Sequence, residues 1–139
     1  MYKPRHVISF TLLLAALFSM CSRNPAGFEP KQGSIVDITA AEAQALIETD
    51  SLLVIIDVRT PAEYNSGHIA NAVNIDFRAG SFISTVDTLD KLKTYLVYCR
   101  SGNRSRSAAE LMIEQQFSLL YNMLGGIDQW KGQGYPVTI

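Results

Sequence analysis

The chain has 139 residues, with 12 basic and 13 acidic side chains and a formal net charge of −1. This length suits one globular domain and is too short for two. The nearly balanced charge shows no sign of the basic surface that nucleic-acid-binding proteins carry, so we expect no nucleic-acid partner.

The first twenty residues are typical of an export signal rather than of a folded domain. Lys3, Arg5 and His6 form a basic start, and residues 7–20 then run without a charge. An uncharged run of fourteen residues suits the apolar core of a signal peptide and is too short for an ordinary membrane span. We therefore predict a signal peptide over residues 1–20.

Cys21 directly follows this apolar segment. A basic start, an apolar run and then a cysteine resemble a bacterial lipoprotein signal, in which the cysteine carries lipid and becomes the mature N-terminus. Ser19 fits that pattern, whereas Met20 is larger than the usual residue before the cysteine and Phe18 replaces the usual leucine. We expect an exported, periplasmic or cell-envelope protein, anchored to the membrane by lipid on Cys21. Ordinary cleavage nearby and an uncleaved anchor are the alternatives.

Residues 21–34 contain several prolines and glycines and no apolar periodicity, so they predict a tether. After the tether, apolar runs alternate with helical patterns. Strands are predicted at residues 35–38, 52–56, 72–75, 95–98 and 119–124. Helices are predicted behind the capping residues Thr39 and Thr60, in part of 79–92, at 103–116 and around Trp130. This alternation predicts one α/β domain over residues 35–139 with a mostly parallel central sheet.

Two polar segments follow predicted strands, at the edge where ligands bind in such sheets. One is Asp57-Val58-Arg59, and the other begins with Cys99 and continues into an arginine-rich loop that opens a helix. A helix N-terminus and nearby arginines both favour a reactive thiolate, and the same N–H groups can hold an anion. If Cys21 carries lipid, Cys99 has no partner for a disulfide, which marks it as a reactive thiol. The alternative, a buried inert cysteine, fits the polar sequence after Cys99 less well.

Three groups of residues together resemble the signatures of rhodanese-like domains. The first group contains Asp57-Val58-Arg59, Glu63-Tyr64, Gly67-His68-Ile69 and Ala72-Val73-Asn74-Ile75. The second is Cys99-Arg100-Ser101-Gly102-Asn103-Arg104-Ser105, which resembles the active-site loop of the family. The third contains Gly125-Gly126, Trp130, Gly134 and Pro136. The groups keep the family order, so the resemblance implies a rhodanese-like α/β fold whose central sheet has helices on both faces.

One residue departs from the family pattern. Asn71 stands where the family commonly has glycine. Asparagine adopts left-handed backbone more readily than most residues, so this departure leaves the expected fold intact.

The resemblance implies sulfurtransferase chemistry, with Cys99 as the catalytic nucleophile. Cys99 would take a sulfane sulfur from a donor such as thiosulfate, hold it as a persulfide and pass it to a thiophilic acceptor. The residues expected to bind the substrate are Arg100, Ser101, Gly102, Asn103, Arg104 and Ser105. Within this loop, Arg100 and Arg104 are expected to hold the anion and favour the thiolate. We expect no cofactor and no metal ion, because no cluster of residues has metal-ligand spacing.

The length of the loop separates sulfur transfer from phosphate chemistry. Related phosphatases of the same fold place the essential arginine six positions after the cysteine. Here Ser105 occupies the sixth position and Arg104 the fifth. The shorter loop suits a single sulfur atom better than a tetrahedral phosphate, so a phosphatase is the less favoured interpretation.

Several other residues have structural interpretations. Asp57 and Arg59 are expected to form an ion pair that supports the loop, and Glu63 is expected to be a helix cap. His68 is interpreted as a hydrogen-bonded scaffold residue rather than a general base, and Trp130 as packing for the last helix.

The alternative function is a non-catalytic persulfide carrier or a protein-docking module of the same fold. The expected partners are a small sulfur-containing anion or a thiol acceptor, and the membrane through the N-terminal lipid. We expect the protein to be a monomer.

Overall fold

The computed structural model describes residues 33–139. The predicted signal peptide, Cys21 and nearly all of the predicted tether therefore lie outside the described residues. Within residues 33–139, no helix is long and apolar enough to cross a membrane.

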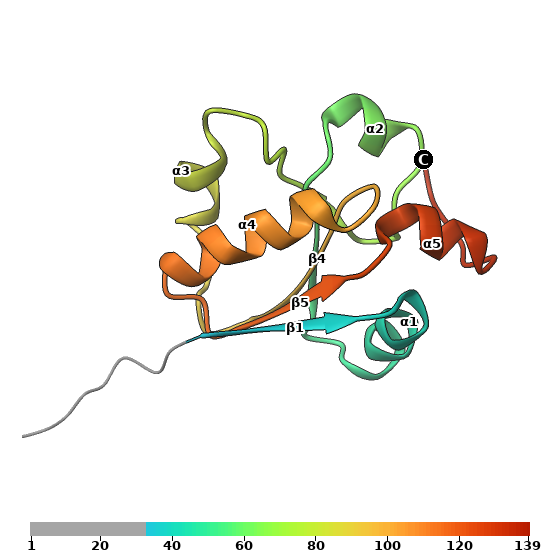
Figure 1. Cartoon of the computed structure of the whole chain (residues 1–139), viewed down its shortest axis with the longest axis horizontal. Coiled ribbons are helices and arrows are strands. Elements are labelled where there is room, and N and C mark those ends of the chain that lie inside the picture. Colours follow the sequence, from blue (N-terminus) through green and yellow to red (C-terminus); the bar gives the residue numbers. More distant parts are fainter. Residues whose placement is uncertain (1–32) are drawn as a thin grey trace, which may run out of the picture.

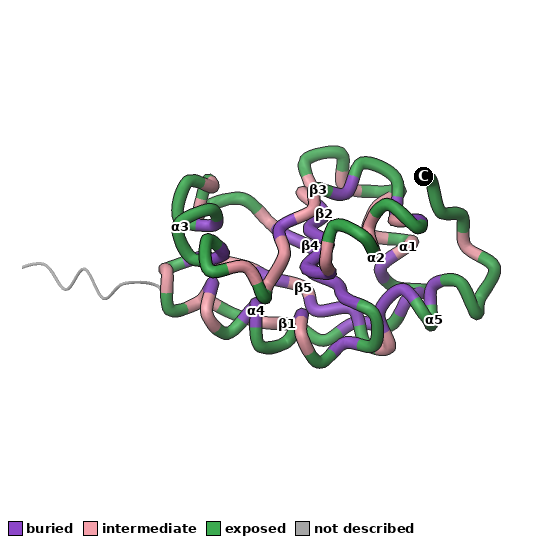
Figure 2. Tube along the Cα trace, turned by 90° about the horizontal axis from the view of Figure 1, so that it is seen from above, coloured by how far each residue is buried: buried purple, intermediate pink, exposed green. Residues whose placement is uncertain are grey.

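A five-stranded sheet forms the centre of the domain (Figure 1). Its strand order is β1-β5-β4-β2-β3, and Figure 2 labels all five strands. Every pairing between neighbouring strands is parallel, which confirms the predicted sheet. The strands are β1 (Ser34–Ile38), β2 (Val54–Asp57), β3 (Val73–Asn74), β4 (Thr94–Tyr98) and β5 (Leu119–Met123).

Five helices connect or follow these strands. They are α1 (Ala40–Thr49), α2 (Pro61–Asn65), α3 (Phe82–Val86), α4 (Asn103–Glu114) and α5 (Gly126–Gly132). Both predicted capping boxes are present, Thr39 with Glu42 before α1 and Thr60 with Glu63 before α2. Each box satisfies N–H groups that the first turn of a helix leaves without partners, and this explains where the two helices begin.

Several predicted elements are shorter in the structure, including the strands predicted at residues 72–75 and 119–124 and the helix predicted at 103–116. The strand predicted at residues 52–56 begins at Val54, because the Leu52 N–H bonds the Asp50 carboxylate at 2.9 Å in a turn and the Leu52 side chain is 80% exposed. The helix predicted within 79–92 covers only α3, whose N-cap Ser81 makes no side-chain capping bond. Strand β1 begins at Ser34, one residue before the predicted domain start.

Helices cover both faces of the sheet. Helices α3 and α4 pack on one face, where Phe82 and Met112 are buried, and α1 and α5 pack on the other with Ala43 and Trp130. Strand β4 alternates between these two cores, and Figure 2 shows its buried course through the middle of the domain. A parallel strand that is buried on both faces has a continuous apolar sequence, and residues 95–98 show this pattern.

The strand order places the ends of β2, β4 and β5 next to one another. Strand β4 lies between β5 and β2, and all three point in the same direction. The segments that follow them begin at Val58, Cys99 and Leu124. The polar segments that the sequence places after separate strands therefore meet at one edge of the sheet.

Candidate active site

Cys99 follows the central strand β4 and is a free thiol that is only 1% exposed. The Gly102 N–H donates a hydrogen bond to its Sγ at 3.1 Å, and the Ser105 hydroxyl lies 3.6 Å from the same atom. Gly102 has a φ of 103° and caps the N-terminus of α4. The loop therefore turns sharply after Cys99 and directs the start of the helix at the sulfur.

Burial and hydrogen bonding act on the Cys99 thiol in opposite directions. Burial alone would raise the pKa of Cys99, because it penalises the charged form. Hydrogen bonds from the Ser105 backbone and hydroxyl, and from the Gly102 and Ser101 backbone, lower that pKa, and the net pKa lies below the ordinary thiol value. The loop thus stabilises the thiolate, which is the nucleophilic form of cysteine.

The N-terminus of α5 supports this loop from behind. The Ile127 N–H bonds the Cys99 carbonyl at 2.9 Å, and the Asp128 N–H bonds the Arg100 carbonyl at 3.1 Å. Gly126 has a φ of 54°, and a Cβ there would overlap the same two carbonyl groups. Gly126 of the C-terminal signature is therefore a packing requirement of the active-site loop.

A polar chain that runs from the core to the surface holds Ser105, and the sequence analysis did not identify two of its members, the buried Asn122 and the exposed Asp37. The Ser105 hydroxyl lies 2.7 Å from Asn122 Oδ1, and Asn122 Nδ2 donates to the Asp37 carboxylate at 2.8 Å. Asn122 is buried in β5 beside apolar neighbours. A single polar residue inside a predicted buried strand was the signal that could have revealed it, because buried polar groups need partners.

Arg104 forms a bidentate ion pair with Glu63, at 2.9 Å from Nη1 and 2.7 Å from Nη2. The two side chains are 18% and 31% exposed. Hydrogen bonds from Arg104, and secondarily from Thr60, lower the pKa of Glu63 to about 2 against an opposing contribution from burial. The interpretation of Glu63 as a helix cap alone was incomplete, because its carboxylate both caps α2 and binds Arg104.

The other predicted substrate-binding residues differ in position. Gly102 and Ser105 are buried against Cys99, whereas Ser101 and Asn103 are exposed on the outer side of the loop. The Arg100 side chain is 70% exposed, and its Nε lies 3.3 Å from the Asp128 carboxylate. Of the two arginines expected to hold an anion, Arg104 is the enclosed one.

Asp57 and Arg59 form the expected ion pair, at 2.6 Å, and both are buried. Arg59 also donates to the Gly67 carbonyl at 2.8 Å, and its guanidinium lies 5.8 Å from the centre of the Tyr98 ring. Across residues 33–139, no side-chain hydrogen bond joins this pair to the loop from Cys99 onward. The Arg59 guanidinium instead contacts Tyr98, the residue before the nucleophile.

The remaining motif residues have structural positions. The His68 ring stacks on Tyr64 at 3.7 Å, and its Nδ1 lies 3.1 Å from the Tyr64 carbonyl, which confirms the scaffold interpretation. Trp130 is buried and donates to the Pro136 carbonyl at 2.8 Å, as expected for packing of α5. Asn71 has a φ of 64°, the left-handed backbone expected where the family has glycine.

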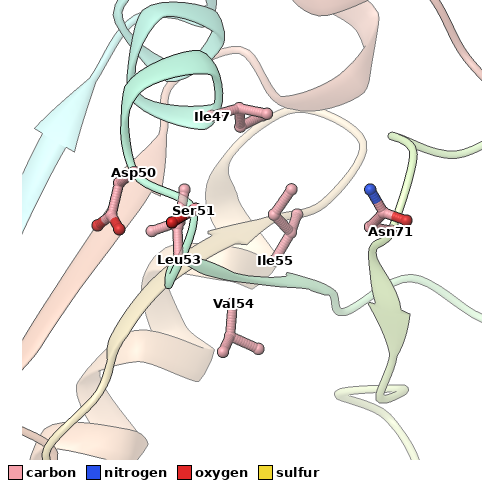
Figure 3. A pocket seen from close by; sticks show the side chains of 7 residues that line it. All are labelled: Ile47, Asp50, Ser51, Leu53, Val54, Ile55 and Asn71. Atoms are coloured by element: carbon pink, nitrogen blue, oxygen red, sulfur yellow. The ribbon is translucent and has the colours of Figure 1, made fainter.

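A cavity of about 400 Å³ lies apart from the loop, between the end of α1 and strand β2 (Figure 3). Its walls include Ile47, Val54 and Asn71, and none of its lining residues belongs to the Cys99 loop. Among the described residues, no group of three histidine, cysteine or carboxylate side chains could hold a metal ion.

Known proteins share this sequence and fold. The model of the rhodanese-like domain matches residues 39–133. The putative sulfurtransferase YtwF of Bacillus subtilis is 39% identical over 102 residues, which are 73% of this chain and 96% of the relative. The thiosulfate sulfurtransferase GlpE of Pseudomonas syringae is 40% identical over 95 residues, which are 68% of this chain and 85% of the relative.

A solved structure agrees with these relatives. The crystal structure of a rhodanese-related protein from Thermoplasma volcanium superposes with a TM-score of 0.65 at 33% sequence identity. The match covers 74% of this chain and 97% of that one. Sequence, fold and the enclosed thiol lead to one conclusion: the chain belongs to the rhodanese-like domain family, as a rhodanese-type sulfurtransferase.

Proposed function

We propose that this sulfurtransferase moves sulfane sulfur from a donor such as thiosulfate to a thiophilic acceptor through a persulfide on Cys99. The observation that carries the proposal is the environment of Sγ, which is enclosed, receives the Gly102 N–H and has a lowered pKa. The relatives named sulfurtransferase support the same chemistry.

The transfer would proceed in two balanced steps. The Cys99 thiolate attacks the outer sulfur of thiosulfate, a new S–S bond forms, and sulfite leaves with the electron pair of the broken S–S bond. Cyanide or a thiolate then attacks the terminal sulfur of the persulfide, and the Cys99 thiolate leaves as the original nucleophile. Covalent catalysis of this kind gives ping-pong kinetics.

The loop supplies what both steps need. Its N–H groups face the sulfur, where they stabilise the thiolate before the attack and the negative terminal sulfur after it. Gly102 and Gly126 bring the backbone close, and a Cβ at Gly102 would lie 3.3 Å from the Gly125 nitrogen. Arg104 stands at the fifth position after Cys99, and this short spacing favours a single sulfur atom over a phosphate group.

The test measures thiocyanate production from thiosulfate and cyanide by the full-length chain. We expect Cys99→Ser to abolish turnover, because the serine hydroxyl cannot form a persulfide. Undiminished activity in this variant would refute the role of Cys99. Mass spectrometry of the protein as purified provides a second readout. A persulfide on Cys99 without turnover would indicate the carrier alternative.

We also propose that the protein is exported and anchored by lipid on Cys21. The support is the leader of residues 1–20, whose basic start and apolar run directly precede that cysteine. A diacyl group with an amide-linked chain holds a protein at a membrane stably, whereas one chain is marginal. Cys21→Ala should release the protein from the membrane fraction, and a mature wild-type N-terminus without lipid would contradict the proposal.

A further inference from the structure

Each arginine near the Cys99 loop already has a carboxylate partner. Arg104 pairs with Glu63, Arg100 with Asp128, and Arg59 with Asp57. Thiosulfate would bring two negative charges to a site that also holds a thiolate. In the described part of the chain, the positive charges of these three arginines are therefore already compensated before such a donor binds.

The Arg104–Glu63 pair is the most consequential of these for a bound anion. Both η nitrogens of Arg104 point to the two oxygens of Glu63, and both side chains are partly buried. The Arg100–Asp128 pair is more exposed, and the Asp57–Arg59 pair makes no bond to the loop. Water screens a partly buried pair less than an exposed one, so Glu63 weakens the attraction that Arg104 would exert on an anion more than Asp128 weakens that of Arg100.

We propose that Glu63 is a specificity-determining residue that neutralises Arg104 and so disfavours dianionic donors relative to organic persulfides. The proposal rests on the proposed function and names its substrate class. With an organic persulfide R–S–SH, the Cys99 thiolate attacks the outer sulfur, the S–S bond breaks, and the thiolate R–S⁻ leaves. Atoms and charge balance without any further reagent, and the donor carries at most one charge at its sulfur group.

The chain contains a matched control for Glu63. Glu42 occupies the same position in the other capping box, and its carboxylate accepts from the Thr39 N–H and hydroxyl at 2.7 and 2.8 Å. Glu42 is exposed, and its carboxylate bonds Thr39 rather than any arginine. Glu42→Gln therefore repeats the chemical change at a capping box while leaving the active site untouched.

The decisive variant is Glu63→Gln, since glutamine can still accept the capping bonds from Thr60. Thiosulfate and 2-hydroxyethyl persulfide would serve as donors. We expect the KM for thiosulfate to fall on the order of tenfold, because the Arg104 charge is no longer compensated by a carboxylate. We expect kcat and the KM for the persulfide to change less than about twofold, and Glu42→Gln to match the wild type. Added salt should raise the thiosulfate KM more steeply in Glu63→Gln than in the wild type.

A binding measurement separates this proposal from the proposed function. Thiosulfate is titrated calorimetrically into the Cys99→Ser chain with and without Glu63→Gln, so no turnover is needed. Tighter binding in the double variant supports neutralisation by Glu63. Unchanged or weaker binding, or an equal rise in KM for both donors, would show that Glu63 only orients Arg104 and would overturn the proposal. Absence of turnover in the wild type with either donor would instead count against the proposed function.

Discussion

Helices α1 and α2 begin with the same four-residue capping box, yet the two boxes lie in different surroundings. The carboxylate of Glu42 is exposed and bonds Thr39, whereas that of Glu63 bonds Thr60 and also Arg104 of the active-site loop. The difference arises because α2 follows β2, whose neighbour β4 leads into the loop, while α1 follows the edge strand β1. One local motif thus has a purely structural use in one place and a second, electrostatic one in the other.

Of the changes that test this comparison, removal of Arg104 should have the largest effect on activity. Arg104→Ala leaves the Glu63 carboxylate enclosed without its cation, beside a thiolate and an anionic donor. We expect kcat/KM for thiosulfate to fall about 100-fold, since a charge-assisted pair is replaced by an uncompensated charge. Steady-state thiocyanate production measures the change.

Two further variants test whether repulsion by Glu63 causes that loss of activity. Adding Glu63→Gln to Arg104→Ala should recover part of the activity, because the uncompensated charge is removed. Lys91→Ala removes the cation of an exposed pair with Asp87 and should leave activity unchanged. If the double variant is no better than Arg104→Ala, repulsion by Glu63 is not the cause of the loss.

The next largest effect should be the contribution of Glu63 to stability in acid. The pKa of Glu63 is about 2 in the folded protein against an ordinary value of 4.5, so its ionised form stabilises the fold above pH 4.5. This contribution, about 1–2 kcal/mol after screening by water, is lost as the pH falls from 4.5 through 2. Urea unfolding of the wild type and Glu63→Gln between pH 6 and 2 measures it. Equal pH dependence in both proteins would show that the Arg104 pair does not stabilise the fold.

The smallest expected effect concerns the capping threonines. Thr60→Ala should lower the free energy of unfolding by about 1 kcal/mol, and Thr39→Ala by about half as much. The reason is that the bond between Thr60 and Glu63 is partly buried, whereas the bond between Thr39 and Glu42 is exposed to competing water. Urea unfolding at pH 7 compares them, and a larger loss at Thr39 would contradict the assigned difference in burial.

Local patterns in the sequence predicted much of the fold. Both capping boxes depend on residues three apart, and the buried strand before Cys99 shows as an apolar run. The boundaries that failed, at Leu52 and within 79–92, lie where apolar composition continues past the hydrogen bonds that define the element. Composition reports what a segment can bury, whereas the end of a strand depends on the turn beside it.

The active site also has a part that the local sequence predicts and a part that it does not. The loop from Cys99 to Ser105 is continuous in sequence, so its nucleophile, its glycine and its helix start could all be identified there. Glu63 and Arg104 are 41 positions apart, and Asn122 and Asp37 are 85 apart. A polar residue such as Asn122 inside an apolar strand signals that it needs a partner, but nothing local shows which residue that partner is.

The sequence by itself determined the local elements, the place of Cys99 after a buried strand and the glycine that turns the chain at the thiol. Only the tertiary structure decided the strand order β1-β5-β4-β2-β3, and with it which side chains meet at the edge of the sheet. Backbone hydrogen bonds and side-chain periodicity act over a few residues, so they can be predicted from the local sequence. The partner of a charge such as Arg104 depends instead on how the strands are arranged, and so on the packing of the whole domain.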